Sequence, residues 1–252
     1  AHSVTKVDYK RFILTYRWRL KVAHMKKVTT DERLGLSDAH VEYFDNLSVA
    51  LRPATARAFM KLRQAAVRDG IDLWPVSGFR SFQRQVHIWN QKWHGQRTLL
   101  DRRGLEVKAQ NLSSAQRIEM ILAWSAPPGA SRHHWGSDLD VYDKAALKKD
   151  YQLQLTPSEY EPGGPMSMLG EWLDHHLPRF GFYRPYRIDR GGVQPEPWHL
   201  SHYPMAIECS KGLRVQQLIH AVDKLETPWA KGLVKKMPEI YERFVRSVDR
   251  YG

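Results

Sequence analysis

The sequence predicts an α+β fold, in which helices flank a small, mainly antiparallel sheet and further helical extensions lie at both ends of the chain. Segments with helical periodicity stand before and after short segments that have the pattern of strands. No internal repeat is present, and no apolar run approaches the ~20 residues that a membrane-spanning helix needs. Hydrophobic residues make up 42% of the 252 residues, which is enough to form a buried core.

The chain divides into three parts by composition and pattern. Residues 1–50 are charged and weakly periodic, and we expect them to form an N-terminal extension packed on the main domain. Within this extension, SDAHVEYFDNL predicts a helix that is capped by Ser37. Residues 51–205 form the predicted main domain, and residues 206–252 form a helical segment of that same domain.

The helices are predicted from apolar residues that recur every three or four positions. PATARAFMKLRQAAVRDG has proline at its start and Gly70 at its end. Its apolar face consists of Ala58, Phe59, Leu62 and Ala66. SFQRQVHIWNQKW opens at Ser81, and its apolar face consists of Phe82, Val86, Trp89 and Trp93. SSAQRIEMILAWS and MSMLGEWLDHHL give two more helices, and from about Lys211 two segments follow with breaks near Pro228 and Pro238.

Four short segments have the pattern of strands. IDLWPVSG is an apolar run and DLDVY alternates between polar and apolar residues, as a strand with one buried face does. FGFYRPY predicts another strand, and EPWHL begins the last one after the loop DRGGVQP. The sequence FRS therefore lies at a turn from a strand to a helix.

The balance of charges favours an anionic partner. Lys and Arg number 39 against 27 Asp and Glu, which gives a formal net charge of +12. Nucleic acid, a cell-wall polymer or an acidic peptide would each be attracted. The basic residues are scattered and the chain has neither zinc-finger cysteines nor a glycine-aromatic RNA signature, so no nucleic-acid partner is expected.

Cysteine content and the first residues bear on chemistry and compartment. The single Cys209 forms no internal disulfide and provides no thiolate cluster, so any metal must be held by His, Asp and Glu. AHSVTKVDYKRF lacks the apolar core of a signal peptide, which favours the cytoplasm. Removal of a signal peptide would instead place the protein in the periplasm or the cell wall.

Two separated stretches, SRHHWGSDLDVYD and EPWHLSHY, carry the residues of a candidate metal site. Zinc in hydrolases takes three protein ligands and leaves one position for water. His133, Asp140 and His199 could supply this set. Because residues two apart in a strand share a face, Asp138 and Asp140 point the same way and either could reach the metal. Spacing alone does not choose between them.

Glu196 lies three residues before His199, across a Pro-Trp pair. Proline after Glu196 favours extended backbone, so this is not the helical His-Glu-x-x-His arrangement of other zinc proteases. A glutamate beside the metal can act as a general base that takes a proton from water and passes it to the leaving amine.

These stretches resemble the VanY-type D-alanyl-D-alanine carboxypeptidases, part of a wider group with the lysostaphin-type peptidases and the hedgehog signalling domain. That family carries Ser-x-His-x-x-Gly-x-Ala-x-Asp followed by Glu-Pro-Trp-His. The matching residues here are Ser131, His133, Gly136, Asp140, Glu196, Pro197, Trp198 and His199. SGFRSFQRQ resembles the family's Ser-Gly-Tyr-Arg-Ser segment, with Ser77, Gly78, Arg80, Ser81 and the later Gln85 in place. The resemblance covers roughly residues 50 to 205.

The resemblance implies a role for each matched residue. His133, Asp140 and His199 are the expected Zn²⁺ ligands and Glu196 is the expected catalytic base. Arg80 should hold the C-terminal carboxylate of the substrate, because a guanidinium binds a carboxylate through two hydrogen bonds. The other expected substrate-binding residues are Ser131, Gln85 and Trp198. Asp138 stands where the family has alanine, and we expect it to orient a ligand histidine.

The implied function is removal of the terminal D-alanine from peptidoglycan stem peptides by a zinc-dependent carboxypeptidase. L,D-carboxypeptidase or peptidoglycan endopeptidase activity remains as an alternative within the group. A zinc-bearing binding module without catalysis is the alternative of another class, although such a module needs neither Glu196 nor Arg80. Four further histidines are not expected to bind the metal: His134, His175, His176 and His202.

Overall fold

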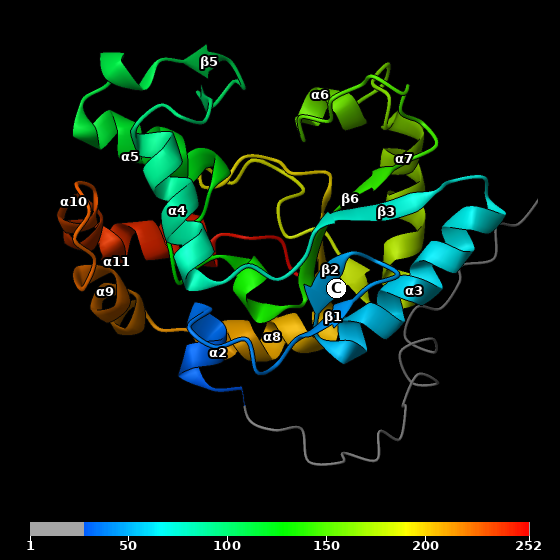
Figure 1. Cartoon of the computed structure of the whole chain (residues 1–252), viewed down its shortest axis with the longest axis horizontal. Helices are drawn as coiled ribbons and strands as arrows, with labels where there is room; N and C mark the ends of the chain where they lie inside the picture. Colours follow the sequence, from blue (N-terminus) through cyan, green and yellow to red (C-terminus); the bar gives the residue numbers. More distant parts are fainter. Residues whose placement is uncertain (1–27, 252) are drawn as a thin grey trace, which may run out of the picture.

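The structure is a computed structural model that describes residues 28–251 (Figure 1). Its main sheet has four antiparallel strands in the order β3 (Leu73–Ser77), β6 (Asp138–Asp143), β8 (His199–His202) and β7 (Phe182–Tyr183). Helices lie around this sheet, and two short hairpins accompany it. The predicted α+β class with a small antiparallel sheet is therefore confirmed.

Of the helices in the described residues, α3, α4, α5 and α7 lie where apolar periodicity predicts them, whereas α2 and α6 were not predicted. The N-terminal half contains α2 (Thr30–Leu34), α3 (Pro53–Arg68), α4 (Phe82–Trp93) and α5 (Ser114–Trp124). The middle of the chain contains α6 (Pro157–Tyr160) and α7 (Ser167–His176). The C-terminal part contains α8 (Tyr203–Gly212), α9 (Val215–Asp223), α10 (Ala230–Lys235), α11 (Met237–Ile240) and a π-helical turn (Tyr241–Arg246). Within residues 28–251, no helix is both long enough and apolar enough to cross a membrane.

Two separate hydrophobic cores divide the molecule. One core lies between the main sheet, α3 and α7, and includes Phe59 and Leu139; we call this part the sheet half. The other lies among α4, α5 and the C-terminal helices, where Trp89 packs on Trp229 with ring centroids 5.1 Å apart; we call this part the helical half. The two halves lie side by side in Figure 1, with the sheet half on the right.

The helix predicted from Ser37 is wrong. Only Ser37–Ala39 makes a short polar turn, and the segment then forms a hairpin of β1 (Glu42–Phe44) and β2 (Val49–Leu51). Asp45 and Asn46 favour the turn between the strands, and the alternate residues Val49 and Leu51 are buried. The rest of the predicted extension that precedes Val28 lies outside the described residues.

The C-terminal prediction needs two adjustments. Helical structure begins at Tyr203, with α8, rather than near Lys211. Pro228 precedes α10 and Pro238 lies in the first turn of α11, so both prolines mark helix starts, where a missing backbone N–H is tolerated.

The predicted strand in FGFYRPY is reduced to the two residues of β7.

Candidate metal centre

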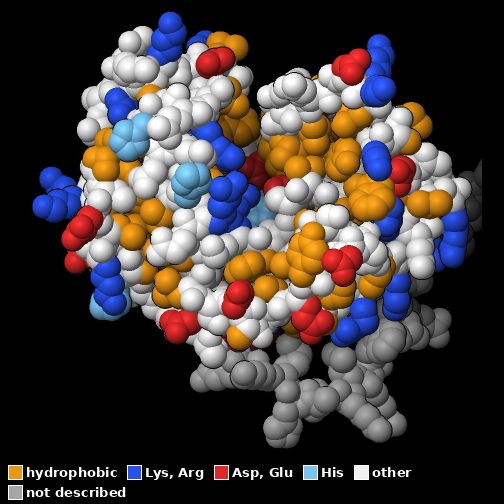
Figure 2. Space-filling view, viewed as in Figure 1, with side chains coloured by type: hydrophobic (Ala, Val, Ile, Leu, Met, Phe, Trp, Pro, Cys, Tyr) orange, Lys and Arg blue, Asp and Glu red, His pale blue; other side chains and the backbone are white. Residues whose placement is uncertain are grey.

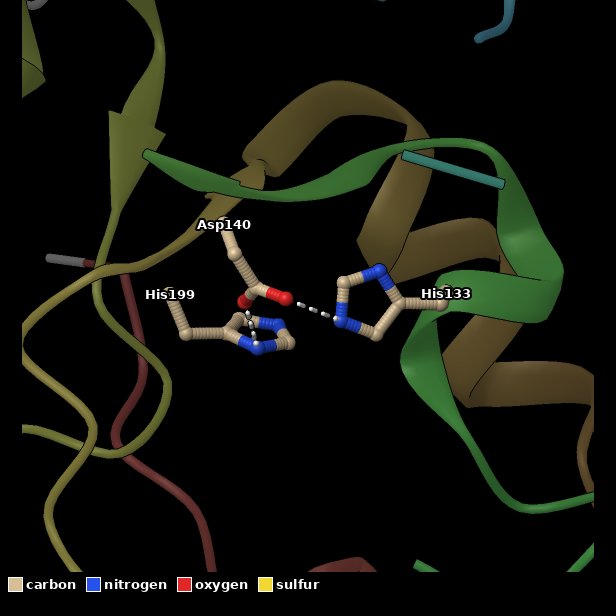
Figure 3. A group of neighbouring side chains, drawn as sticks. All are labelled: His133, Asp140 and His199. Atoms are coloured by element: carbon tan, nitrogen blue, oxygen red, sulfur yellow. Dashed lines mark ion pairs between the residues drawn. The ribbon is translucent and has the colours of Figure 1, made fainter. Parts of the chain in front are cut away.

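Three side chains from two separate stretches of the sequence meet beside β6 and β8, the two central strands of the main sheet (Figure 3). His133 comes from the 3-10 turn Arg132–Trp135, Asp140 from β6 and His199 from the start of β8. One potential ligand atom from each residue lies within 4.8 Å of the others. All three residues are buried. The structure thus brings together the three residues predicted as metal ligands.

The β6–β8 pairing and the turn that follows β3 orient the side chains of the candidate ligands. Asp140 and His199 are paired directly in the β6–β8 register, which places their side chains next to each other. The Ser77 hydroxyl donates to Asp140 Oδ2 at 2.6 Å, and the Gly78 carbonyl contacts His133 Nδ1 at 2.8 Å. The contact at Nδ1 leaves His133 Nε2 facing Asp140 Oδ2, 3.4 Å away. Ser77 and Gly78 therefore orient two of the three candidate ligands.

Gly78 is required by a close approach of backbones. A Cβ atom at this position would lie 2.6 Å from the carbonyl oxygen of Ala50 in β2. Phe79, the next residue, donates its backbone N–H to that same oxygen at 2.8 Å. The β1–β2 hairpin thus holds the turn that presents the Gly78 carbonyl to His133.

The imidazole of His199 lies between two carboxylates. Its Nδ1 is 3.3 Å from Asp140 Oδ1, and its Nε2 is 3.1 Å from Asp138 Oδ1. The strand alternation that places Asp138 and Asp140 on one face is therefore confirmed, and the two residues contact opposite nitrogens. Burial disfavours a charged imidazole, but the nearby carboxylates of Asp138, Asp140 and Glu196 raise the pKa of His199 well above its usual range.

Asp138 belongs to a buried polar network behind His199. Arg132 Nε donates to Asp138 Oδ1 at 2.8 Å, and the Ser137 hydroxyl donates to Asp138 Oδ2 at 2.6 Å. Arg132 also donates to Tyr183 and Ser201. Burial opposes ionisation of Asp138, yet the charge of Arg132 and the contact with His199 hold the pKa of Asp138 below its usual range. An ionised Asp138 leaves His199 Nδ1 as the nitrogen directed at Asp140.

The donor set fits a zinc ion. Two imidazole nitrogens and one carboxylate form a three-ligand set with room for water, as in catalytic zinc sites. Asp140 Oδ1 is buried and has no hydrogen-bond partner among the described residues. A buried carboxylate oxygen without a partner is costly, and a bound cation would provide that partner.

Glu196 lies beside the triad. Its Oε2 is 3.2 Å from His199 Nδ1, the same nitrogen that faces Asp140. Two backbone hydrogen bonds fix the chain on both sides of Pro197. Glu196 N–H donates to the Tyr186 carbonyl at 2.9 Å, and His199 N–H donates to the Glu196 carbonyl at 3.1 Å. Glu196 also lines the cavity that lies between the two halves of the molecule, so its carboxylate can reach a water molecule there.

The predicted substrate-binding residues divide into those that line the cavity and one that does not. Arg80, Ser131 and Trp198 line it. The Ser131 hydroxyl makes no cap hydrogen bond to the following turn, although Ser131 stands at its start. Gln85 is fully buried and does not line the cavity; its Oε1 accepts a hydrogen bond from Arg80 Nη1 at 3.0 Å. Gln85 therefore contacts Arg80 rather than the open space.

The cavity itself is a cleft of about 680 Å³ between the two halves (Figure 2). Its walls include α4, α5 and the loop around Arg97 on one side, and the segment Gln154–Thr156 on the other. Figure 2 shows Lys and Arg side chains gathered along one wall and hydrophobic side chains along the opposite wall. The volume lies in the range of ordinary small-ligand sites, so a peptide end can enter.

The other histidines have structural contacts. His134 lies in a 3-10 turn; its Nδ1 contacts the Arg80 carbonyl at 2.6 Å and its Nε2 accepts from Gly129 N–H at 3.0 Å. His202 contacts the Thr55 hydroxyl at 3.1 Å. Neither belongs to the triad.

Sequence reasoning missed two residues around the site. Arg132 was not considered, because its partner Asp138 is brought close only by the turn between them. Lys92 was not considered either, because helical spacing alone does not say which face of α4 meets a cavity. A basic residue one turn from the apolar Ile88 is the only sequence signal that could have pointed to Lys92.

Two curated proteins are similar to this chain over part of its length. A curated relative from Enterococcus faecalis, a D-alanyl-D-alanine carboxypeptidase, is 30% identical over 141 residues, which are 55% of this chain and 42% of that protein. An uncharacterized protein of Haemophilus influenzae is 35% identical over 118 residues, which are 46% of this chain and 90% of that protein.

Among solved structures, that of VanYB in complex with D-alanine-D-alanine has 23% identity and a TM-score of 0.48, and the match covers 74% of this chain and 89% of that one. The structure of the LdcB LD-carboxypeptidase has 18% identity and a TM-score of 0.46, with 81% and 78% covered. The sequence family described as VanY, D-alanyl-D-alanine carboxypeptidase, matches residues 48–205, which is more than half of the chain. On the strength of this sequence match, the chain belongs to the VanY family of carboxypeptidases.

Proposed function

We propose that the protein is a zinc-dependent carboxypeptidase that removes the terminal D-alanine from peptidoglycan stem peptides. The observation that carries this proposal is the meeting of His133, Asp140 and His199 beside Glu196 in one cavity with Arg80. Membership of the VanY family and the similarity to an Enterococcus faecalis D-alanyl-D-alanine carboxypeptidase support the substrate class.

In this proposal the metal is held by His133 Nε2, an oxygen of Asp140 and His199 Nδ1. These atoms face one another, whereas the opposite nitrogens of the two imidazoles contact the Gly78 carbonyl and Asp138. A bound zinc ion would supply Lewis-acid chemistry, since it polarises a peptide carbonyl and acidifies water. Asp138 holds His199 in the orientation that this ligand set needs.

The chain's own residues then divide the work of peptide hydrolysis. Glu196 accepts the proton of the attacking water and passes it to the nitrogen of the departing amino acid, so that the C–N bond breaks and an amine leaves. Arg80 binds the C-terminal carboxylate, and Gln85 holds the Arg80 guanidinium in place through its amide oxygen. Ser131 and Trp198 border the bound chain end from the cavity wall.

The direct test is release of D-alanine from stem pentapeptide and stem tetrapeptide, with mass analysis of the products. Release from the pentapeptide alone supports D,D-carboxypeptidase activity, and release from the tetrapeptide alone identifies an L,D-carboxypeptidase. Cleavage within cross-linked muropeptides but not at chain ends would identify an endopeptidase. A protein that binds zinc and cleaves none of these substrates would contradict the proposal and favour a binding module.

A further inference from the structure

Glu196, the proposed base, lies at one end of a long loop. No regular secondary structure lies between β7 and β8, and we call residues 185–196 of this stretch the base loop. The Glu196 N–H donates to the Tyr186 carbonyl at 2.9 Å, which ties the two ends of the base loop together. No Lys or Arg of the described residues forms an ion pair with the Glu196 carboxylate. The position of this carboxylate therefore depends on the backbone of the base loop.

Asp249 holds the base loop from its outer side. The Asp249 carboxylate accepts from two backbone N–H groups and one guanidinium of the loop, which belong to Arg187, Ile188 and Arg190. The nearer backbone nitrogen, that of Arg187, is 2.9 Å from Asp249 Oδ2. The backbone N–H of Asp249 donates to the Pro185 carbonyl at 2.8 Å. Asp249 thus binds the loop on both sides of Tyr186, whose carbonyl holds Glu196.

The segment that carries Asp249 is anchored before and after this residue. Before it, Phe244 is buried in the core of the helical half. After it, the ring of Tyr251 stacks on that of Tyr203, with centroids 4.1 Å apart. The Asp249 side chain is only 15% exposed. We call residues 247–251 the tail, and these contacts hold the tail against the base loop.

The π-helical turn that precedes the tail also packs on the base loop. Arg243 Nε donates to the Gly191 carbonyl at 2.6 Å. A Cβ atom at Gly192 would collide with the Arg243 carbonyl, so only glycine fits there. The turn and the tail both lie outside residues 48–205, the part of the chain that the VanY family matches. Family membership therefore does not account for this support of the base loop.

We propose that Asp249 is a positioning residue that keeps the Glu196 carboxylate beside the candidate metal centre. This inference rests on the proposed function, because Glu196 is taken to be the base. Asp249 holds the N–H of Arg187, and the carbonyl of the adjacent Tyr186 holds the Glu196 N–H. A base must stand within hydrogen-bonding distance of the proton that it accepts, so a small displacement lowers the rate. The candidate metal ligands and Arg80 lie outside the base loop.

The test compares Asp249→Asn with the wild type on the stem peptide that the wild type cleaves. Whichever way its amide turns, asparagine directs an NH₂ group at one set of donors, so it cannot hold both Arg190 and the backbone N–H groups. We expect kcat to fall about 10-fold, with KM and zinc content unchanged. Asp223→Asn, at an exposed position of α9, is the matched control and should change none of these values. An unchanged kcat, or a loss of zinc together with kcat, would overturn the positioning role.

A second comparison separates positioning from general destabilisation. In Glu196→Gln no base remains to be placed, so adding Asp249→Asn should lower kcat no further. A fall by the same factor in both backgrounds would show that Asp249 acts on the whole fold and would contradict the proposal. Should Asp249→Asn not fold, Arg190→Met removes only the ion pair and should lower kcat about 3-fold. An unchanged kcat in Arg190→Met would then contradict the proposal.

Failure of the proposed function gives a different result. If the zinc-loaded wild type cleaves no stem peptide, the carboxypeptidase assignment fails, and backbone hydrogen exchange then tests the support of the base loop by itself. Asp249→Asn should speed exchange of the Glu196 N–H about 10-fold and leave the N–H groups of β6 unchanged. Equal exchange rates at Glu196 in Asp249→Asn and the wild type would contradict the proposal.

Discussion

The two sides of the cavity, one in the sheet half and one in the helical half, differ in how their charged side chains are paired. In the sheet half, Asp138 is paired with Arg132 and His199, and Asp140 accepts from Ser77. On the helical side of the cavity, Arg80 has only the neutral Gln85 as a hydrogen-bonding side-chain partner, and Lys92 has no ion pair among residues 28–251. The candidate metal centre therefore lies among paired charges on the sheet side, whereas Arg80 and Lys92 on the helical side have no carboxylate partner among the described residues.

The largest expected effect comes from removing the base in the sheet half. Glu196→Gln keeps the size of the side chain but cannot accept the proton, so kcat should fall about 10³-fold while the zinc content stays the same. Steady-state kinetics and elemental analysis of the same sample measure both quantities. Glu106→Gln, at an exposed position in the cavity wall, is the control and should keep its activity. Retained activity of Glu196→Gln would remove Glu196 from the mechanism.

A second substitution lowers zinc affinity in the sheet half and leaves all three proposed metal ligands unsubstituted. Asp138→Asn removes the charge that holds His199 Nε2, and we expect zinc affinity to fall about 10- to 100-fold. Competition with a chelator of known affinity measures it. Because Arg132 also loses its buried partner, circular dichroism must first establish that the variant is folded. Asp150→Asn, on the surface, is the control. Unchanged zinc affinity in a folded Asp138→Asn would exclude the orienting role.

A change in the helical half should act on binding alone. Gln85→Met removes the acceptor for Arg80 Nη1 in a side chain of similar length, and KM should rise about 10-fold with little change in kcat. Zinc content should equal that of the wild type, in contrast to Asp138→Asn. Gln152→Met, at an exposed site, serves as the control. A fall in zinc content instead of a rise in KM would show that the two halves are not separable.

The smallest expected effect concerns the buried His134. Burial lowers the pKa of His134 to about 3, so below pH 6.5 the unfolded chain takes up a proton that the folded chain does not. Its contribution to stability is complete above pH 6.5 and is lost as the pH falls toward 3. His202, with a pKa lowered to about 4 by burial, acts in the same direction.

We therefore expect the free energy of unfolding to fall more steeply with acidity in the wild type than in His134→Gln. The difference should approach about 1 kcal/mol per pH unit between pH 6 and 4. Urea unfolding of metal-free protein over that range measures it, with His94→Gln, at an exposed site, as the control. Parallel curves for the wild type and His134→Gln would contradict the assigned ionisation.

The parts that the sequence predicts are those governed by local spacing. The apolar faces of α3 and α4 and the alternation of β6 are local patterns, and each element forms where the pattern lies. The proposed ligands were identified because two motifs share the residues of a known family. Their meeting in space follows from the β6–β8 pairing.

The parts that it does not predict depend on contacts between distant residues. The sequence predicts a helix in residues 37–47, but this segment forms β1 and the turn after it, because β1 pairs with β2, which buries Val49 and Leu51. Gln85 was expected to bind substrate, but whether it faces Arg80 or the open cavity depends on how α4 packs. The free charge of Lys92 appears only once every neighbouring carboxylate has been placed.

The central claim is that the sheet half holds a catalytic zinc ion. The most direct measurement is the zinc content of the purified protein together with D-alanine release from stem pentapeptide, before and after treatment with a chelator. We predict about one zinc ion per chain, D-alanine release that the chelator abolishes and recovery when zinc is returned. A protein that releases D-alanine at the same rate after its zinc has been removed would contradict the account.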